Sequence, residues 1–235
     1  MRQVAQAARE VPGLETSRFP ARDGYSYSPS LVMLSDPYGG AAEAVRGVRT
    51  HIMAQHVEEG RRALAICGPS AGVGCTFLAV NLALAFSQVG IRTLLIDGNL
   101  RAPAVHKILQ PPKLTNGLRH CLGVTDPAFG GNIDAGVQPN LSVMYSGGSA
   151  PNPQELLSTS SFHALMDYCM REYDLTIVDT PPANTSSDSR RISTVCGYSL
   201  IVARRNVSLV GDVRTLAAQI RTDHGRVVGT VLNEA

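Results

Sequence analysis

Gly68-Pro69-Ser70-Ala71-Gly72-Val73-Gly74-Cys75-Thr76 decides the fold, because this stretch has the spacing of a phosphate-binding loop, or P-loop. The P-loop pattern is G-x-x-x-x-G-K-[ST]. Gly72, Gly74 and Thr76 fit this pattern. Pro69 stands where the first glycine belongs, and Cys75 replaces the lysine. The backbone pattern therefore indicates a nucleotide site, and the cysteine indicates that the site is chemically impaired.

The sequence on both sides of the loop alternates between apolar strands and helices. The predicted strands are 63–67, 93–97, 141–145, 175–179, 200–203 and 227–232, and the predicted helices are 41–59, 75–89, 162–173 and 209–220. Near-continuous apolar strands alternating with helices are typical of a parallel sheet covered on both faces. We therefore predict an α/β fold with a mostly parallel, doubly wound sheet. Proline and glycine clusters in 103–148 predict an irregular insertion over the site.

The composition and the placement of the prolines predict one domain with an N-terminal tail. The 235 residues are 44% apolar, which is enough for one large core. Four scattered prolines in a polar context predict a flexible N-terminal tail over 1–38, followed by a single domain over 39–235. The net charge of +2 gives no argument for a nucleic-acid partner. Five cysteines without a C-x-x-C pair favour a reducing cytoplasm, and no apolar run approaches the ~20 residues of a membrane helix.

Two aspartates follow apolar strands and are candidate ligands for Mg²⁺. Asp97 ends the strand 93–97, and Asp179 ends the strand 175–179. In parallel sheets, ligands bind beyond the carboxyl ends of the strands, so both aspartates and the glycine loop are expected to converge. Asp179 would orient Mg²⁺ as a Walker-B-like acid, with the Thr76 hydroxyl as a further ligand. The alternative is a plain cap or turn role for each aspartate.

The glycine loop can bind phosphate without a lysine, because its backbone N–H groups and the following helix attract anions. We assign this role to Gly72, Val73, Gly74, Cys75 and Thr76. Losing the ammonium group is expected to reduce turnover more than binding, since that charge offsets the charge developing on the transferred phosphate. The alternatives are an ordinary glycine-rich turn and, for the cysteine, a reactive thiol at a helix N-terminus.

Two further elements carry candidate residues. Asn233 follows the last predicted strand and could present its amide to a purine edge, or it could be a terminal turn residue. Glu43, Arg46 and Arg49 recur at steps of three on one side of a predicted helix. They form either a solvated face with weak ion pairs or an interface with another subunit.

Together these residues resemble the cytoplasmic domain of the BY-kinases, bacterial tyrosine kinases of capsule and exopolysaccharide assembly. The resemblance covers about residues 36–233. It is carried by Glu43-x-x-Arg46-x-x-Arg49, by the element containing Asp97, Asn99, Arg101 and Pro103, by Asp179-x-Pro181-Pro182, and by the run 146–158. It implies a deviant P-loop NTPase fold of the MinD/ParA kind, ATP or ADP with Mg²⁺ as cofactors, and a ring-forming oligomer. It also implies catalytic roles for Asp97, Asn99 and Asp179 and a nucleotide-binding role for Arg101.

The sequence departs from the family at three points. Cys75 replaces the P-loop lysine, and Asn99 replaces the second acid of its element. The tyrosine cluster that relatives carry after the last strand is not seen, since Tyr198 is the last tyrosine of the sequence; Tyr25 and Tyr27 are alternative acceptors.

These departures favour a catalytically impaired regulatory or scaffolding subunit of polysaccharide synthesis and export. We expect it in the cytoplasm, held peripherally at the inner membrane by a membrane-embedded co-polymerase encoded as a separate chain. One alternative is an active tyrosine autokinase in which Arg101, or an arginine of a neighbouring subunit, replaces the lysine. The other is a MinD/ParA-like positioning ATPase.

Overall fold

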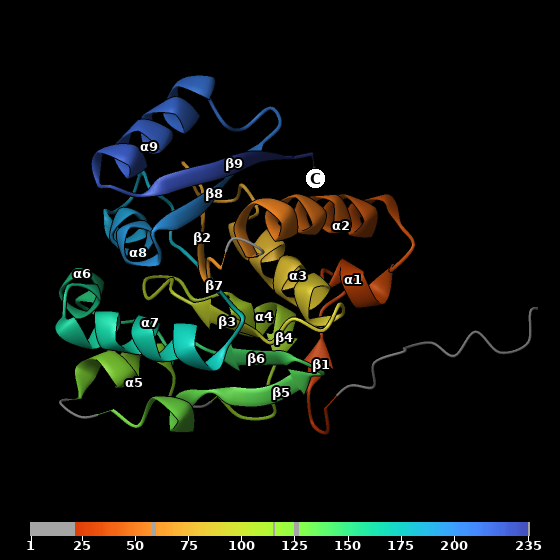
Figure 1. Cartoon of the computed structure of the whole chain (residues 1–235), viewed down its shortest axis with the longest axis vertical. Helices are drawn as coiled ribbons and strands as arrows, with labels where there is room; N and C mark the ends of the chain where they lie inside the picture. The colour runs from red at the N-terminus through yellow and green to blue at the C-terminus, as the bar shows by residue number, and fades with distance from the viewer. Residues whose placement is uncertain (1–21, 58–59, 115, 125–126, 235) are drawn as a thin grey trace, which may run out of the picture.

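The computed structural model describes residues 22–57, 60–114, 116–124 and 127–234. Its centre is a seven-stranded sheet in the order β5-β6-β3-β7-β2-β8-β9 (Figure 1). The strands are β2 (Ala63–Cys67), β3 (Thr93–Asp97), β5 (Asp134–Gln138), β6 (Leu141–Met144), β7 (Leu175–Asp179), β8 (Tyr198–Arg204) and β9 (Arg226–Asn233). Every neighbouring pair is parallel except β5 and β6. The predicted α/β fold with a mostly parallel, doubly wound sheet is confirmed.

Helices cover both faces of this sheet (Figure 1). On one face lie α1 (Val32–Ser35), α2 (Gly40–Ile52), α3 (Cys75–Ser87) and α4 (Val105–Ile108). On the other lie α5 (Leu118–Gly123), α6 (Pro153–Leu157), α7 (Ser160–Glu172), α8 (Asp188–Cys196) and α9 (Val210–Thr222). Side chains alternate along each strand, so Leu64 and Ile66 of β2 join the first core and Ala65 joins the second.

The first helical face differs from the prediction at both ends of α2. A π-helical turn (Met53–Val57) continues α2 within the predicted helix 41–59, and residues 58–59 lie outside the described part. Residues 22–38 were predicted as part of a tail, but they carry β1 (Ser26–Tyr27) and α1. Leu31 and Met33 are buried in the core, which is why this segment packs instead of extending into solvent. The remainder of the predicted tail, residues 1–21, lies outside the described residues.

The segment 103–148 is more regular than its proline and glycine clusters predict. It contains α4, β4 (Leu109–Gln110), α5, a 3₁₀ turn (Phe129–Asn132), β5 and the predicted strand β6. β4 pairs with β1 in a small antiparallel sheet, and β5 closes one edge of the main sheet. The segment is therefore part of the framework at the β5 edge, and not an irregular cover over the site.

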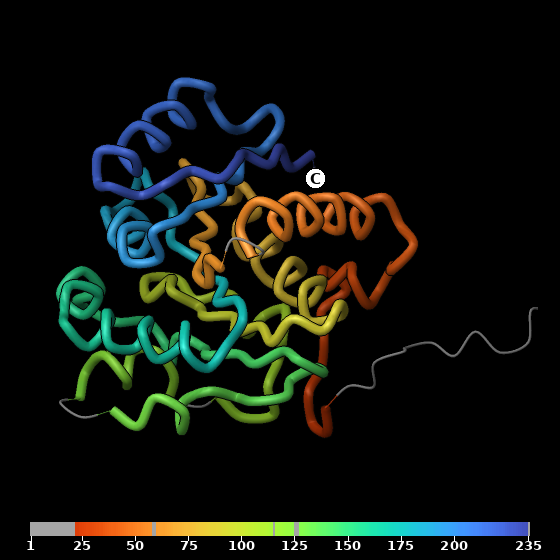
Figure 2. Tube along the Cα trace, in the orientation of Figure 1, coloured from red at the N-terminus to blue at the C-terminus, as the bar shows by residue number. Residues whose placement is uncertain are grey.

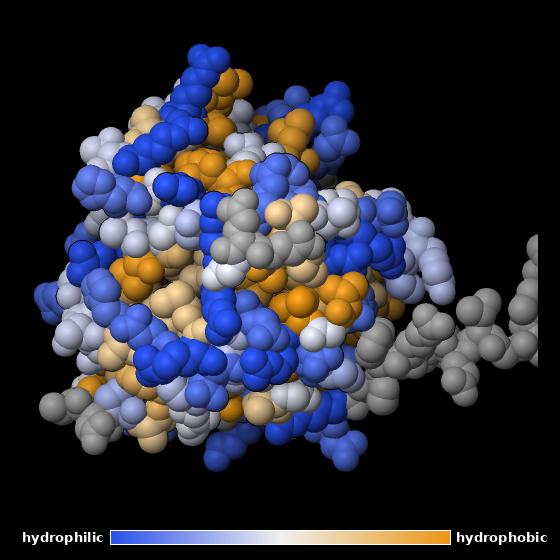
Figure 3. Space-filling model, in the orientation of Figure 1, coloured by the Kyte–Doolittle hydropathy of each residue, from blue (hydrophilic) through white to orange (hydrophobic). Residues whose placement is uncertain are grey.

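The surface is mixed in character. On the face shown in Figure 3, apolar side chains form separate orange patches among blue polar residues. Large apolar side chains that are more than half exposed include Tyr38, Leu114, Leu209, Val210 and Leu232. Among the helices that the structure describes, none is long and apolar enough to cross a membrane.

Candidate nucleotide site

The P-loop lies between β2 and α3, at the carboxyl edge of the sheet (Figures 1 and 2). Gly72 and Gly74 have φ angles of +75° and +101°, in the left-handed region that favours glycine. Gly74 is also the N-cap residue of α3, which begins at Cys75, so the N-terminus of that helix faces the loop. Ala71 and Gly72 are exposed, and Val73 is buried beneath them. This is the strand–loop–helix arrangement that binds phosphate through backbone N–H groups.

The two predicted aspartates and the loop threonine come together. Asp97 and Asp179 are aligned partners on the neighbouring strands β3 and β7. The Thr76 hydroxyl donates a hydrogen bond of 2.6 Å to Oδ2 of Asp179. These three side chains thus lie together, as expected of parallel strands whose carboxyl ends meet at one edge.

The pKa values of both carboxyl groups are raised. Burial raises the pKa of Asp97 from 3.8 to about 6, although the backbone N–H groups of Asn99, Ala104 and Val105 oppose the change by donating to its oxygens. Burial raises the pKa of Asp179 as well, and the neighbouring Asp97 adds to the effect. Two buried acids side by side disfavour simultaneous ionisation unless a cation joins them.

The donor set fits Mg²⁺. Oδ1 of Asp179 is buried and lacks a hydrogen-bond partner among the described atoms, as expected of an oxygen that awaits a ligand. Carboxylate and hydroxyl oxygens are the ligands that Mg²⁺ prefers, and the ion is usually bound by one or two carboxylates together with substrate phosphates. In the described part of the chain, no cluster of three His, Cys, Asp or Glu residues forms a separate metal cage.

Cys75 supplies no charge to this site. Burial raises the pKa of its thiol well above 9.0, and the nearby Asp179 raises it further. The side chain therefore stays protonated at neutral pH, which speaks against the alternative of a reactive thiolate. Its sulfur packs so close to Gly68 that a side-chain carbon at that glycine would lie 2.7 Å from the sulfur.

Arg101 binds a carboxylate of α8. Its Nε donates to Oδ2 of Asp188 at 2.7 Å, and Asp188 is 1% exposed at the start of α8. The partner of Arg101 is thus a buried carboxylate of the protein, which explains its position without a nucleotide. Asn99 likewise serves the local backbone, because its side-chain oxygen accepts hydrogen bonds from the N–H groups of Arg101 and Ala102.

Asn233 lies against the loop, as a nucleotide-binding role requires. Its Nδ2 donates to the carbonyl oxygen of Val73 at 3.1 Å. Beside it is a groove of about 470 Å³ between α2, the start of α3 and the end of β9, lined by Val45, Val48, Phe77, Leu78 and Val231 among others. Figures 1 and 2 show the end of β9 beside α2.

Arg204, which the sequence motifs do not single out, also touches the loop. It ends β8, and its Nη1 donates to the carbonyl oxygen of Gly72 at 3.1 Å. The rule that selected Asp97 and Asp179, a polar residue at the carboxyl end of an apolar strand, also applies to this arginine.

The predicted oligomerisation residues make contacts within their own subunit. Arg46 pairs with Glu43 at 3.0 Å and also donates to the carbonyl oxygen of Pro37. Arg49 donates to the carbonyl oxygen of Ala85 in α3 at 3.2 Å. Glu43 is largely exposed and Arg46 partly so.

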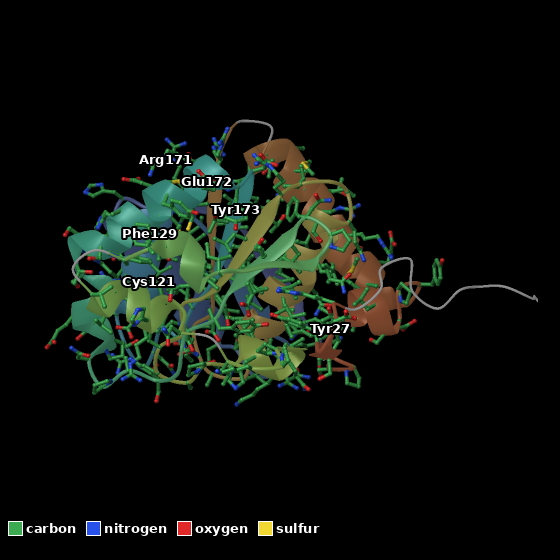
Figure 4. The ribbon with its side chains drawn as sticks, turned by 90° about the horizontal axis from the view of Figure 1, so that it is seen from below. Tyr27, Cys121, Phe129, Arg171, Glu172 and Tyr173 are labelled. Atoms are coloured by element: carbon green, nitrogen blue, oxygen red, sulfur yellow. The ribbon has the colours of Figure 1, made fainter. Side chains whose placement is uncertain are left out.

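Tyr25 and Tyr27, the alternative acceptors, both use their hydroxyls in hydrogen bonds within the chain. Tyr25 donates to Asp134 at 2.9 Å, and burial raises its pKa to about 12. Tyr27 donates to the carbonyl oxygen of Val137 at 2.9 Å. In Figure 4, Tyr27 lies on the side of the molecule opposite Cys121 and Phe129, among the N-terminal elements.

Comparisons with known proteins identify relatives in sequence and in fold. No family model matches the chain. It is 29% identical to CapB of Staphylococcus aureus over 87% of this chain and 89% of that protein. It is 31% identical to the tyrosine-protein kinase Wzc of Salmonella typhi over 86% of this chain, but it spans 28% of the length of Wzc.

Solved structures give the same result. The kinase domain of the Escherichia coli tyrosine kinase ETK superposes with a TM-score of 0.80 and 29% identity, covering 87% of this chain and 80% of that one. The septum site-determining protein MinD of Pyrococcus horikoshii shares the fold, with a TM-score of 0.61 and 16% identity over 73% of this chain and 70% of that one. By sequence and by fold, the chain is a homologue of the CapB- and Wzc-type bacterial tyrosine kinases, with cysteine at the lysine position of its P-loop.

Proposed function

We propose that the chain is a nucleotide-binding, catalytically impaired BY-kinase homologue of capsule or exopolysaccharide synthesis and export. One observation carries the proposal: the loop, Thr76 and the aspartate pair are assembled for a Mg²⁺–nucleotide, while position 75 offers a protonated thiol. Binding needs the first set of groups, and phosphoryl transfer also needs a cation near the moving phosphate.

Different residues would bind the phosphates, the Mg²⁺ ion and the base of the nucleotide. Backbone N–H groups of Gly72 to Thr76 would hold the phosphates. Thr76, Asp179 and Asp97 would hold Mg²⁺, directly or through water. When bound, Mg²⁺ would neutralise charge on the phosphate oxygens and relieve the repulsion between the two buried aspartates. The base would enter the apolar groove beside Asn233, whose amide can pair with a purine edge.

We further propose that the subunit acts as a nucleotide-dependent scaffold and not as a source of phosphotyrosine. Glu43 and Arg46 present charge on the outer side of α2, where a second copy could dock to form a ring. α2 also lines the groove next to the loop. The same helix would therefore contact both the nucleotide and the neighbouring subunit. A membrane-embedded co-polymerase would be the partner in trans and would keep the subunit at the cytoplasmic side of the inner membrane.

The test is binding measured separately from turnover. Isothermal titration with Mg-ADP and Mg-ATP is expected to show binding by the wild type and little or none by T76V, which lacks the hydroxyl next to Asp179. Phosphate release from ATP is expected to match that of D179N. Turnover well above D179N would contradict impairment, and no binding of either nucleotide would contradict the nucleotide site itself.

A further inference from the structure

Two side chains from the last two strands hold the P-loop from outside. Arg204 of β8 donates to the Gly72 carbonyl, and Asn233 of β9 donates to the Val73 carbonyl, each at 3.1 Å. Arg204 and Asn233 are aligned partners in the parallel pair β8–β9. The N–H group of Arg205 also donates to the Asn233 carbonyl at 2.8 Å, which fixes this rung of the sheet. Both donors therefore come from one aligned position of the β8–β9 pair, and they bind two consecutive carbonyl groups of the loop.

These two hydrogen bonds set the direction of the N–H groups that would bind phosphate. A trans peptide unit is planar, so its C=O and N–H bonds point in opposite directions. Holding the Gly72 carbonyl outward turns the N–H of Val73 to the other side, and holding the Val73 carbonyl does the same for the N–H of Gly74. Asn233 packs so tightly that a side-chain carbon on Gly74 would lie 2.3 Å from its Nδ2.

The loop needs these two hydrogen bonds because its glycines leave the backbone flexible. Gly72 and Gly74 are both in the left-handed region, and glycine gives the loop more conformational freedom than any other residue. A bond to a loop carbonyl therefore restricts a segment that would otherwise sample other peptide orientations. Arg204 is partly exposed, yet its guanidinium reaches across the loop to make this bond.

We propose that Arg204 is a positioning residue of the nucleotide site. With Asn233, it braces the loop from the sheet edge and pre-orients the N–H groups of Val73 and Gly74 in a chain whose loop has no lysine. Its effect on nucleotide affinity rests on the proposed function, whereas its effect on the loop of the free protein does not.

The first measurement is the backbone order parameter of the loop amides, from NMR relaxation of the nucleotide-free protein. R204M is expected to lower the order parameters of Val73 and Gly74 from about 0.85, the value of rigid backbone, toward about 0.6, because the loop loses a hydrogen bond that restrains it. R204K keeps a donor and is expected to restore part of this order. R205M is the matched control, because Arg205 is the next residue and pairs with Glu234 instead of the loop. If R204M does not fold, R204Q replaces it.

The second measurement is the affinity for Mg-ADP by titration calorimetry. R204M is expected to weaken binding about twofold to tenfold, the effect of losing one hydrogen bond, while R205M matches the wild type. Unchanged order parameters at Val73 and Gly74 in R204M would overturn the proposal, even if Mg-ADP binding weakened, because Arg204 would then contact the phosphates directly. If the wild type binds no nucleotide, the proposed function fails, and the order parameters still decide whether Arg204 restrains the loop.

Discussion

Cys75 changes the electrostatics of the two carboxyl groups beside the loop. A lysine at this position would place an ammonium group near Asp179, whereas the protonated thiol leaves the repulsion between Asp97 and Asp179 to be relieved by proton uptake or by a bound metal ion. The raised pKa values of these acids therefore make stability depend on pH.

The first prediction concerns this pH dependence. An acid whose folded pKa is raised holds its proton in the folded state at a pH where the unfolded chain has released it. The stability it contributes is thus present below pH 3.8 and is lost as pH rises through about 6, the pKa of Asp97. D179N removes one acid of the pair, so its melting temperature is expected to exceed that of the wild type more at pH 8 than at pH 5.

Thermal unfolding without nucleotide at the two pH values measures this difference. D167N is the matched control, because Asp167 is exposed on α7, and its offset from the wild type is expected to be the same at both pH values. A D179N protein that is less stable than the wild type by the same amount at pH 5 and pH 8 would contradict the predicted repulsion.

The second prediction concerns Arg101. Removing this arginine leaves the carboxylate of Asp188, which is 1% exposed, without its partner. R101M is expected to lower the free energy of unfolding by about 2 kcal/mol, less than for a fully buried pair because Arg101 is partly exposed. Adding D188N to R101M is expected to restore most of the loss.

Urea denaturation gives these values. R190M is the control, since Arg190 pairs with Asp223 at 2.6 Å with both side chains about a third exposed, and its loss is expected to stay under about 1 kcal/mol. If R101M were as mild as R190M and weakened nucleotide binding instead, Arg101 would be a nucleotide residue as the resemblance implied.

At the scale of the elements, the sequence predicts the strands near the site because each is an apolar run, and two of them, β3 and β7, end at an aspartate. Asp97 and Asp179 could be placed because parallel strands end at one edge, and that rule needs no side-chain detail. The role of Arg101 could not be predicted, because it depends on α8. That helix is polar (DSRRISTVC), and its clearest sequence signal is Gly197, which ends it in a left-handed conformation.

Two other elements were missed for physical reasons. β1 and α1 fall in a proline-containing segment, and nothing local reveals that Leu31 and Met33 fill the core beside α3. β5 contains Gly136 at a positive φ and pairs irregularly with β6, so it lacks the regular alternation by which a strand is recognised.

The third prediction separates the two roles of α2. Arg49 donates to Ala85 near the C-terminal end of α3, where carbonyl groups carry partial negative charge, and burial lowers its pKa. R49M is expected to cost about 1 kcal/mol of stability through this lost bond. E43Q alters an exposed side chain and is expected to keep the stability of the wild type while weakening self-association.

Denaturation together with light scattering checks this division. The expected result is that R49M shifts the denaturation midpoint and E43Q shifts the oligomeric mass. An R49M protein with unchanged stability and lost assembly would show that Arg49 belongs to an intersubunit contact and not to the α2–α3 packing.

Over the whole molecule, the nucleotide site lies where three parts of the chain meet. The P-loop comes from the centre of the sheet, Arg204 and Asn233 come from its β9 edge, and α2 lines the groove beside them. A ligand in the groove would touch the helix that carries Glu43 and Arg46. Nucleotide binding and assembly are therefore expected to depend on each other.

The most direct test of the central claim is the rate of phosphate release from ATP by the wild type, C75K and C75M. C75M matches the length of lysine without its charge. We expect C75K to exceed both of the other proteins by roughly 100-fold or more, the usual effect of one charge-stabilising group, and to change Mg-ADP affinity by a smaller factor. A wild-type rate equal to that of C75K would show that the chain already has its cation and would contradict the claim.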